Sequence, residues 1–468
     1  MRVDANELQR FFRPKSVAVV GASVKEGTVG RALIENLIER FRGRIYPVNI
    51  KYDEVLGLKC FKSCRDLPEP PDLVVVAVPA RVVPKVIDEC GSIGSRAAVV
   101  ISAGFREIGG EGAKLEEAVV KMARKHGMRV IGPNCLGIYS PSVGLDTIFN
   151  PSDRQGKPDA GPVAFISQSG ALGAAVLDWF TEAGLGMSKF VSYGNAADVK
   201  EYELIEFLAD DEETKVITAY LEGVEDGRKF SESLRYAAGR GKPVIILKAG
   251  KSVKGAKAVS SHTGSMAGSY RVYESAIKQF GGLLVDELSE LVIAAKALSW
   301  LPTPRGDRVA IVTNGGGAGV LATDAVEKYG MRMAELTDDT QKALRNELPS
   351  AAAVGNPVDV LGDAPPERYR KALKWVIKDP NVDALVVIGI MQSPAFDPEG
   401  FIEVLREASS GVSKPVVIAA PGGEYTSDKI SKIEKLLHLP AFKTPEEAVR
   451  ALSYLMRWRK VVERFGKG

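Results

Sequence analysis

Residues 16–41 read SVAVVGASVKEGTVGRALIENLIERF, and this segment decides the fold class. An apolar run at 16–21 is followed by a glycine-rich turn and then by an amphipathic stretch at 30–41. Strands buried in a parallel sheet are apolar on both faces, so this order predicts a β-strand, a turn and an α-helix. The segment is therefore predicted to be one βα unit of a parallel sheet.

The same order of strand, turn and helix recurs along the chain. We expect an α/β protein of three consecutive domains with mainly parallel sheets, over 1–140, 155–300 and 306–468. Residues 140–161 are predicted to be a long connection, and residues 301–306 a short proline-containing linker. The predicted strands are 16–21, 44–49, 73–79, 97–102, 129–132, 162–167, 189–193, 215–222, 243–248, 308–314, 384–390 and 414–420. The predicted helices include 30–41, 81–90, 111–126 and 171–180.

Composition excludes several classes of protein. The 62 basic and 59 acidic side chains leave a net charge of +3, which gives no basic surface for nucleic acid. No apolar run is long enough to span a membrane, and the first residues lack the apolar core of a secretory signal. Four irregularly spaced cysteines predict neither a disulfide framework nor a zinc site: Cys60, Cys64, Cys90 and Cys135. These features predict a cytoplasmic protein.

The first block has the character of a nucleotide-binding domain. Glycines after the first strand let backbone amides approach a phosphate at the start of the next helix, although their spacing is not G-x-G-x-x-G. An NAD site would carry an acidic residue after the second strand, whereas this chain has Asn49 and Lys51. These residues suit a phosphorylated ribose, as in coenzyme A or NADP. A lysine in a solvated turn is the alternative.

Later segments of the first block point to the same edge of its sheet. Two strands end at Val78-Pro79 and Ser102-Ala103-Gly104, and Asn134-Cys135 follows the fifth strand. Open α/β sheets bind ligands at the carboxyl ends of their strands, so these residues should line one crevice.

The second block supplies groups for phosphoryl chemistry. Ser167–Gly170 ends a strand and opens a helix, so its amides, two hydroxyls and positive helix end predict an anion cradle. A plain helix N-cap is the alternative reading. Gly194-Asn195 belongs to a second turn of this type, and Glu222 ends a third strand at the same edge, where a solvated carboxylate is the alternative.

His262 is the candidate phosphate carrier. It lies among small residues in SSHTGSMAG at 260–268, which suits a mobile arm better than a core; a loop or capping histidine is the alternative. Neutral imidazole, with a pKa of about 6.5, accepts a phosphoryl group at neutral pH, and Glu222 would orient the ring and stabilise its cation. His126 is predicted to cap a helix, and His438 to be structural.

In their order along the chain, these motifs resemble the succinyl-CoA synthetase superfamily, and most closely the α subunit of the ADP-forming acetyl-CoA synthetases. The resemblance rests on Gly21-Ala22-Ser23, Pro47-Val48-Asn49-x-Lys51, residues 101–105 and 132–137, Ser-Gln-Ser-Gly at 167–170 and the loop around His262. It implies a Rossmann-like CoA-binding domain followed by two flavodoxin-like domains.

The resemblance also implies a role for each matching residue. His262 would be phosphorylated and steadied by Glu222, while Asn134 and Cys135 would lie in the acyl and phosphate pocket. The residues implied in phosphate binding are Ser167, Gln168, Ser169, Gly170, Gly194 and Asn195. Those implied in CoA binding are Gly21, Ala22, Ser23, Gly30, Asn49, Lys51, Val78, Pro79, Ser102, Ala103 and Gly104. No residue of this chain is implied as a metal ligand.

The reaction implied by the resemblance interconverts acyl-CoA, ADP and phosphate with a carboxylic acid, ATP and CoA. It passes through an enzyme-bound acyl phosphate and a phosphohistidine. No segment resembles an ATP-grasp domain, so a partner β subunit would bind ADP or ATP with Mg²⁺, in an α2β2 assembly. Acetate is the default acid, and branched-chain or aryl acids would need only different pocket walls.

Two other functions remain open at this point. An NADP-dependent oxidoreductase would use the first block but leave His262 and Glu222 unexplained, and a non-catalytic CoA-sensing protein would bind CoA with an inert His262. In the third block the glycine-rich segment at 311–319 precedes a helix but lacks the Lys-[Ser/Thr] of a P-loop. Its glycines serve either a phosphate or close packing of the helix on the sheet.

Overall fold

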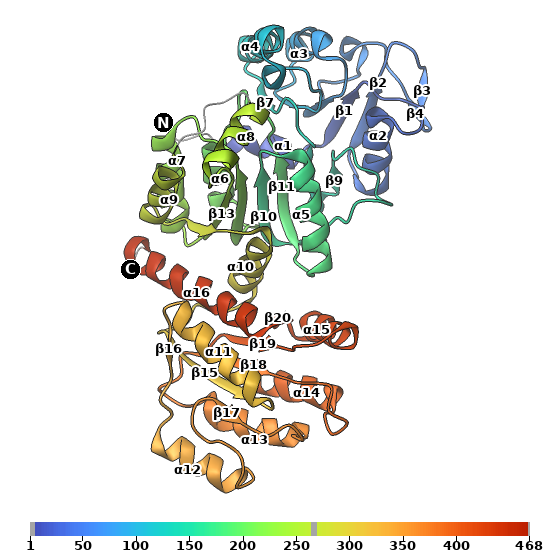
Figure 1. The fold of residues 1–468 in the computed structure, drawn as a ribbon. Helices are drawn as coiled ribbons and strands as arrows, with labels where there is room; N and C mark the ends of the chain where they lie inside the picture. The colour runs from blue at the N-terminus through green and yellow to red at the C-terminus, as the bar shows by residue number, and fades with distance from the viewer. Residues whose placement is uncertain (1–4, 264–268, 467–468) are drawn as a thin grey trace. The chain divides into compact units, whose positions relative to one another are not determined.

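The computed structural model describes the backbone of residues 5–263 and 269–466, and their side chains except at 5–6 and 260–263. The chain divides into unit 1, Met1–Leu291 with Phe465–Gly468, and unit 2, Val292–Arg464. Strands and helices alternate in both units (Figure 1), which confirms the predicted α/β class. The domain boundaries drawn from the sequence remain predictions.

The first sheet of unit 1 is parallel, with the strand order β2-β1-β5-β6-β7. Its strands are β1 (Ser16–Val20), β2 (Arg44–Val48), β5 (Leu73–Val76), β6 (Ala97–Val100) and β7 (Arg129–Ile131). β1, β5 and β6 are buried along their whole length, which explains their continuous apolar sequence. The strand order reverses between β1 and β5, so a ligand crevice is expected at their carboxyl ends.

The second sheet of unit 1 has the order β14-β13-β12-β10-β11-β8-β9. Its strands are β8 (Ile138–Ser140), β9 (Leu145–Asp146), β10 (Ala160–Ser167), β11 (Met187–Ser192), β12 (Val216–Leu221), β13 (Val244–Lys248) and β14 (Leu283–Val285). β10 to β14 run parallel, whereas β8 pairs antiparallel with β11 and with β9. Residues 140–161 were expected to be a connection throughout. That expectation is wrong for β9, which extends the second sheet together with β8.

The sheet of unit 2 is parallel, with the order β16-β15-β18-β19-β20 and β17 also paired to β15. Its strands are β15 (Arg308–Thr313), β16 (Arg332–Met333), β17 (Val358–Asp359), β18 (Ala384–Ile388), β19 (Val416–Ala419) and β20 (Ala441–Phe442). The short strands β16, β17 and β20 have too few residues to show a period and were missed from sequence.

Helices occupy the remaining regular segments. They are α1 (Ala5–Phe12), α2 (Val29–Arg40), α3 (Val83–Ser92), α4 (Gly110–Lys125), α5 (Gly170–Glu182), α6 (Glu201–Asp210), α7 (Gly227–Gly239), α8 (Val253–Thr263), α9 (Tyr270–Gln279), α10 (Leu288–Trp300), α11 (Gly316–Lys328), α12 (Asp338–Glu347), α13 (Pro366–Val376), α14 (Pro398–Ser409), α15 (Glu424–Leu437) and α16 (Pro445–Phe465). A hairpin of β3 (Glu54–Val55) and β4 (Leu58–Lys59) and four short 3-10 helices complete the part of the chain that the structure describes.

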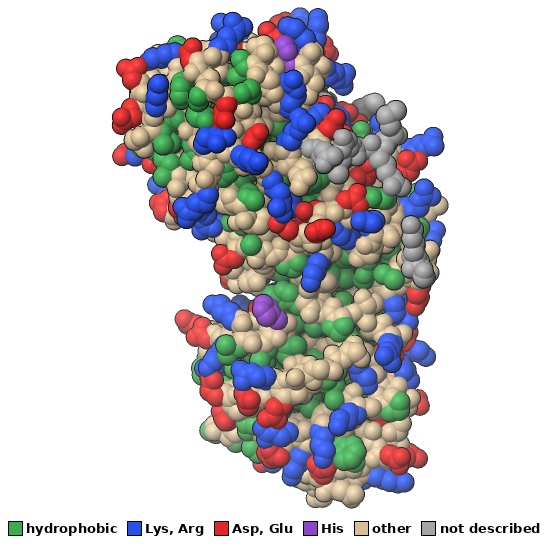
Figure 2. Space-filling view, turned by 180° about the vertical axis from the view of Figure 1, so that it is seen from behind, with side chains coloured by type: hydrophobic (Ala, Val, Ile, Leu, Met, Phe, Trp, Pro, Cys, Tyr) green, Lys and Arg blue, Asp and Glu red, His purple; other side chains and the backbone are tan. Residues whose placement is uncertain are grey.

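Charges of both signs are interspersed on the face shown in Figure 2, with no broad area of Lys and Arg alone. This agrees with the near balance of charge in the sequence. Within the described residues, every helix is too short or too polar to cross a lipid bilayer.

Candidate active site

A cavity of about 810 Å³ lies in unit 1, where the carboxyl ends of the two sheets meet. Its volume is that of a typical small-molecule site. Eight residues singled out from the sequence line it: Val78, Ser102, Ala103, Asn134, Cys135, Gln168, Ser169 and Gly170. The cavity therefore joins the predicted nucleotide crevice of the first sheet to the predicted anion cradle of the second.

The anion cradle is the turn from β10 into α5. The Ser167 hydroxyl is buried and donates to the Ser169 carbonyl at 2.7 Å, while Ser169 Oγ accepts the Leu172 N–H at 3.3 Å as the N-cap. Ser167 therefore shapes the turn and lies outside the cavity lining. The amides of Gly170 and Ala171 lie in the first turn, where a helix offers them no acceptor, and both residues line the cavity. These amides and the positive helix end are the groups that suit an anion.

Gln168 links this turn to the next strand. Its Oε1 accepts the N–H groups of Glu222 and of Gly223, the second at 2.9 Å. A backbone N–H only donates, so the amide oxygen must face the Glu222 turn and the amide nitrogen points elsewhere. The link lies between β10 and β12, where the strand order of the second sheet reverses. That is the usual ligand position in such sheets.

Glu222 follows β12 and is only 5% exposed, which excludes a solvated carboxylate. Burial and then the nearby Glu222 carboxylate, to which the phenol is hydrogen-bonded, raise the pKa of Tyr220. The carboxylate thus lies within hydrogen-bond reach of the Tyr220 hydroxyl, and its predicted role stays a prediction.

Two buried polar groups near Glu222 were missed from sequence. Among the described residues, the Tyr193 hydroxyl and Glu201 Oε1 have no hydrogen-bond partner. Burial raises the pKa of Glu201 to about 7. Burial, and then the charges of Glu201 and Glu222, raise the pKa of Tyr193. An acidic residue in the first turn of a helix is normally exposed, so nothing in the sequence of α6 indicated this burial.

His262 itself lies at the end of α8, whose helical backbone reaches Thr263. The sequence had indicated a mobile arm of small residues between a strand and a helix, and had not predicted that α8 reaches His262. The His262 side chain and residues 264–268 lie outside the described part of the chain. The contact between His262 and Glu222 therefore stays a prediction.

The first sheet places its candidate CoA-binding residues along one edge, but many lie outside the cavity lining. Gly21 has a φ of 98°, and a side chain there would collide with the Ala77 carbonyl, so glycine is required. A side chain at Gly30 would likewise collide with the Gly21 carbonyl. Asn49 shapes its own turn, because Nδ2 donates to the Ala22 carbonyl at 2.7 Å and Oδ1 accepts the Lys51 N–H at 2.9 Å. Asn49 is thus engaged internally, and Lys51 is exposed.

The other candidate CoA-binding residues at this edge differ in their contacts. Ser102 Oγ donates to the Val78 carbonyl at 2.5 Å and fixes the two strand ends together. Glu107 Oε1 accepts the Gly104 N–H at 2.5 Å and the Phe105 N–H at 3.1 Å. A carboxylate already occupies these amides, so they do not suit a phosphate. Ala22, Ser23 and Pro79 lie near the same strand ends but outside the cavity lining.

Gly194 and Asn195 serve mainly to join the two sheets. Gly194 has a φ of 50°, and a side chain there would collide with the Pro133 and Asn134 carbonyls. Asn195 Nδ2 donates to Glu107 at 2.7 Å and to Glu116 at 2.8 Å. Both amide hydrogens are thus used, so Asn195 does not suit the predicted role of a phosphate ligand.

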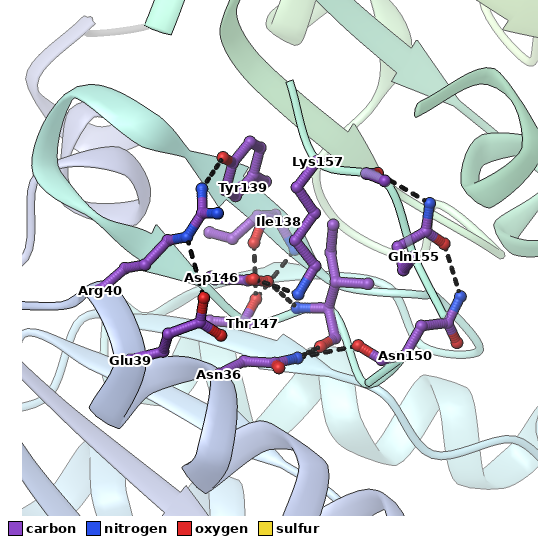
Figure 3. A network of polar contacts seen from close by, with 12 residues as sticks. Asn36, Glu39, Arg40, Ile138, Tyr139, Asp146, Thr147, Asn150, Gln155 and Lys157 are labelled. Carbon is purple, nitrogen blue, oxygen red and sulfur yellow. Dashed lines mark hydrogen bonds and ion pairs between the residues drawn. The ribbon is translucent and has the colours of Figure 1, made fainter. Parts of the chain in front are cut away.

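The segment between the sheets contributes Phe149 and Asn150 to the cavity wall. A polar network fixes this wall (Figure 3). Lys157 and Asp146 form an ion pair whose side chains are 3% and 2% exposed, and Asn36 Nδ2 donates to the Asn150 carbonyl at 3.0 Å. Burial raises the pKa of Asp146, and the Lys157 ammonium opposes that rise. The sequence had suggested an irregular connection here, with no sign of a buried ion pair.

Comparisons with known proteins follow the same division of the chain. Family models match as a CoA binding domain over residues 15–141, a succinyl-CoA ligase like flavodoxin domain over 160–298 and a Ligase-CoA domain over 309–466. The chain is 43% identical to the acetate–CoA ligase [ADP-forming] I subunit alpha of Pyrococcus furiosus, over 97% of this chain and 98% of that one. It is also 43% identical to the acetate–CoA ligase [ADP-forming] I of Archaeoglobus fulgidus, where it spans 64% of the relative's length.

A solved structure is similar over the same extent. It is acetyl-coenzyme A synthetase 1 of Candidatus Korarchaeum cryptofilum, in complex with phosphate and ADP, with 39% identity, a TM-score of 0.91 and coverage of 98% of each chain. The chain belongs to the ADP-forming acetate–CoA ligase family. Its fold is thereby confirmed as a CoA-binding domain followed by succinyl-CoA ligase-like domains.

In this member of the ligase family, the cysteine of the cavity is not a ready nucleophile. Cys135 lines the cavity, but burial raises the pKa of its thiol to about 12, so the sulfur is protonated at neutral pH. In the described ranges, no cluster of three or more His, Cys, Asp or Glu is placed to hold a metal ion. His126 caps α4 and contacts Asp88, and His438 ends α15 and lies edge-on to Trp300. Both histidines have the structural roles expected from the sequence.

Proposed function

We propose that this chain is the α subunit of an NDP-forming acyl-CoA synthetase that uses His262 as a phosphate carrier. The observation that carries the proposal is the cavity that joins the strand ends of the CoA-binding domain to the amides of Gly170 and Ala171. A thioester bound along the first sheet would there meet a phosphate bound at the start of α5.

The first proposed step forms an acyl phosphate. An oxygen of hydrogen phosphate attacks the thioester carbonyl carbon, the carbon–sulfur bond breaks, and the CoA thiolate takes the proton of the hydrogen phosphate and leaves as the thiol. The α5 amides hold the phosphate oxygens, and the neutral Cys135 thiol does not compete as a nucleophile.

The second proposed step transfers the phosphoryl group to His262. A ring nitrogen attacks phosphorus, the bond from phosphorus to the acyl oxygen breaks, and the carboxylate leaves. Glu222 accepts a hydrogen bond from the other ring nitrogen and balances the positive charge of the phosphoimidazole. Phosphohistidine then gives its phosphate to ADP, and every step is reversible.

We further propose that ADP, with Mg²⁺, binds to an ATP-grasp β subunit in an α2β2 assembly. A relative matched over nearly its whole length is named a subunit alpha, whereas the Archaeoglobus relative is longer than this chain. The glycine turn of unit 2 also places the Asp359 carboxylate at the start of α11, where a phosphate would have to bind. Acetate is the simplest acid for this cavity, and the acid class is to be tested with a substrate panel.

The test uses the purified chain and acetyl phosphate. We expect an acid-labile, base-stable phosphate on the protein, and we expect it to be absent from His262→Ala. His126→Ala and His438→Ala are matched controls that should keep the label, because both histidines have structural contacts elsewhere. A label that persists in His262→Ala would overturn the proposal.

A further inference from the structure

Lys248 is a buried ammonium at the edge of the second sheet. It ends β13 and is 6% exposed. Its Nζ donates to the Glu222 carbonyl at 2.9 Å and to the Ala249 carbonyl at 2.6 Å. The Tyr273 ring covers it, with its centroid 4.5 Å from Nζ. The charge is thus held by two carbonyls and an aromatic face.

These contacts join the segments on either side of His262. Glu222 follows β12, Ala249 begins the turn into α8, and Tyr273 belongs to α9, the next helix after α8. The Val224 N–H also donates to the Tyr273 hydroxyl at 3.4 Å. Lys248 therefore connects the Glu222 turn to Ala249, before α8, and to Tyr273 on α9, which follows the segment that carries His262.

The charge of Lys248 also acts on Glu222. Burial lowers the pKa of Lys248 to about 8, and the Glu222 carboxylate opposes that fall. The attraction is mutual, so the ammonium favours the ionised form of the Glu222 carboxylate.

The other titratable groups on the packed elements do not replace this cation. Four of them are not positive: Tyr193 after β11, Glu201 on α6, Tyr220 on β12 and Tyr273 on α9. The cations described on α8 and α9 are exposed: Lys254, Lys257, Arg271 and Lys278. Within this set, Lys248 is the buried positive charge.

We propose that Lys248 is a positioning residue for the phosphohistidine step: it ties the Glu222 turn to the start of α8 and holds a buried positive charge beside that turn. The inference rests on the proposed function. It adds that Glu222 depends on a lysine from the neighbouring strand to bind the His262 ring as an anion.

The test compares two buried lysines. Lys248→Met keeps the length of the side chain and removes its charge and donors. Lys296→Met is the matched control, because Lys296 is also 6% exposed but pairs with Glu434 in unit 2, at 2.7 Å. The rate of His262 phosphorylation by acetyl phosphate is measured from about pH 5.5 to 9, together with CoA affinity and the melting temperature.

For Lys248→Met we expect phosphorylation about 10-fold slower near neutral pH and an acid limb of the pH profile moved up by about 1 unit, because Glu222 then holds its proton more tightly. CoA affinity should be unchanged. Lys248→Arg should keep the wild-type acid limb even if its rate falls, and Lys296→Met should keep both rate and profile.

An acid limb that stays in place in Lys248→Met would overturn the inference, as would equal rate losses in Lys248→Met and Lys296→Met. Loss of CoA affinity in Lys248→Met would also overturn it, since the role would then be merely structural. An unlabelled wild-type chain would instead overturn the proposed function, and the inference with it.

Discussion

The turn after β10 in unit 1 and the turn after β15 in unit 2 are built alike but end differently. In both, a buried hydroxyl at the strand end bonds within the turn: Ser167 to the Ser169 carbonyl at 2.7 Å, and Thr313 to the Gly315 carbonyl at 3.0 Å. In both, the next residue carries an amide side chain that reaches the neighbouring strand across the point where the strand order reverses.

The amide side chains make the difference. Asn314 forms a closed pair with Ile390, because Oδ1 accepts its N–H at 2.7 Å and Nδ2 donates to its carbonyl at 3.1 Å. Gln168 uses only its oxygen on the Glu222 turn and also lines the cavity. A Cβ at Gly316 would lie 3.2 Å from Asp359 Oδ2, so a carboxylate lies at the start of α11.

A glycine turn before a helix is therefore not a phosphate site in itself. The turn of unit 2 satisfies its own polar groups and places a negative charge where an anion would bind. Of the six buried side-chain atoms without a hydrogen-bond partner among the described residues, five belong to unit 1. Two of the five are the Tyr193 hydroxyl and Glu201 Oε1, which lie near one another.

The largest effect is expected when a carboxylate is placed at the start of α5 in unit 1, as Asp359 is at the start of α11 in unit 2. Ser169→Asp keeps a good N-cap for α5 but adds a carboxylate beside the Gly170 and Ala171 amides. We expect phosphate-dependent release of CoA from acetyl-CoA to fall by about 100-fold or more. Thiol release is the measurement, and Ser169→Asn, a neutral cap, is the control. Similar rates in the two variants would refute the anion site.

Buried carboxylates offer a second contrast. The pKa of Glu201 is raised from 4.5 to about 7, so the folded chain holds this proton more tightly than the unfolded chain does. Stability should therefore fall as pH rises from about 4.5 to about 7, by on the order of 3 kcal/mol at most. Glu201→Gln should remove this loss, which melting temperatures across that range would reveal.

Glu434 of unit 2 is the matched carboxylate, because it pairs with Lys296. Glu434→Gln should lower the melting temperature throughout the range, since it leaves a buried ammonium without its partner. A pH slope that persists in Glu201→Gln would show that another group causes it.

Gln168 and Asn314 can each be replaced by the acid of the same shape. Gln168→Glu still accepts both N–H groups of the Glu222 turn but loses its amide hydrogens, so we expect phosphorylation of His262 to slow about 10-fold at unchanged stability. Asn314→Asp leaves the Ile390 carbonyl unpaired and should cost about 1–3 kcal/mol of stability without changing that rate. Phosphate labelling measures the rate and thermal melting the stability of both variants. A normal rate in Gln168→Glu, or a slowed rate in Asn314→Asp, would contradict these roles of the two amide side chains.

The smallest expected effect lies within α11. Gly317 is exposed, and a Cβ there would have no atom within 4 Å, so Gly317→Ala should raise stability by about 0.5–1 kcal/mol. A Cβ at Gly319 would lie 3.1 Å from Thr313 Cγ2, and Gly319→Ala should lower stability through crowding. Both are read from melting temperatures, and a loss of stability in Gly317→Ala would contradict the packing account.

Much of the fold could be predicted because its long strands are continuous apolar runs. The predicted 16–21 and 243–248 differ from β1 and β13 by one residue at one end. Contacts that depend on register could not be predicted. Lys248 reaches the Glu222 carbonyl because Leu221 is the register partner of Lys248 between β12 and β13. Gln168 meets Glu222 for a similar reason, since β10 pairs with β12.

The sequence predicted where the candidate site lies, but it did not predict most of the side-chain contacts within it. Strand ends alone indicated Ser102, Asn134 and Gln168, all of which line the cavity. They did not indicate that Asn195 is taken up by two carboxylates, because Glu107 and Glu116 are more than 75 residues away in sequence. Long-range side-chain pairing leaves no local pattern in the sequence.

The antiparallel strands β8 and β9 have a consequence for how these modules can be exchanged. They precede the predicted start of the second domain at 155, yet they cover the outer edge of β11. A fragment cut at 155 would expose that edge, and bare strand edges promote aggregation. We expect a fragment that carries residues 138–146 as well to keep this edge covered.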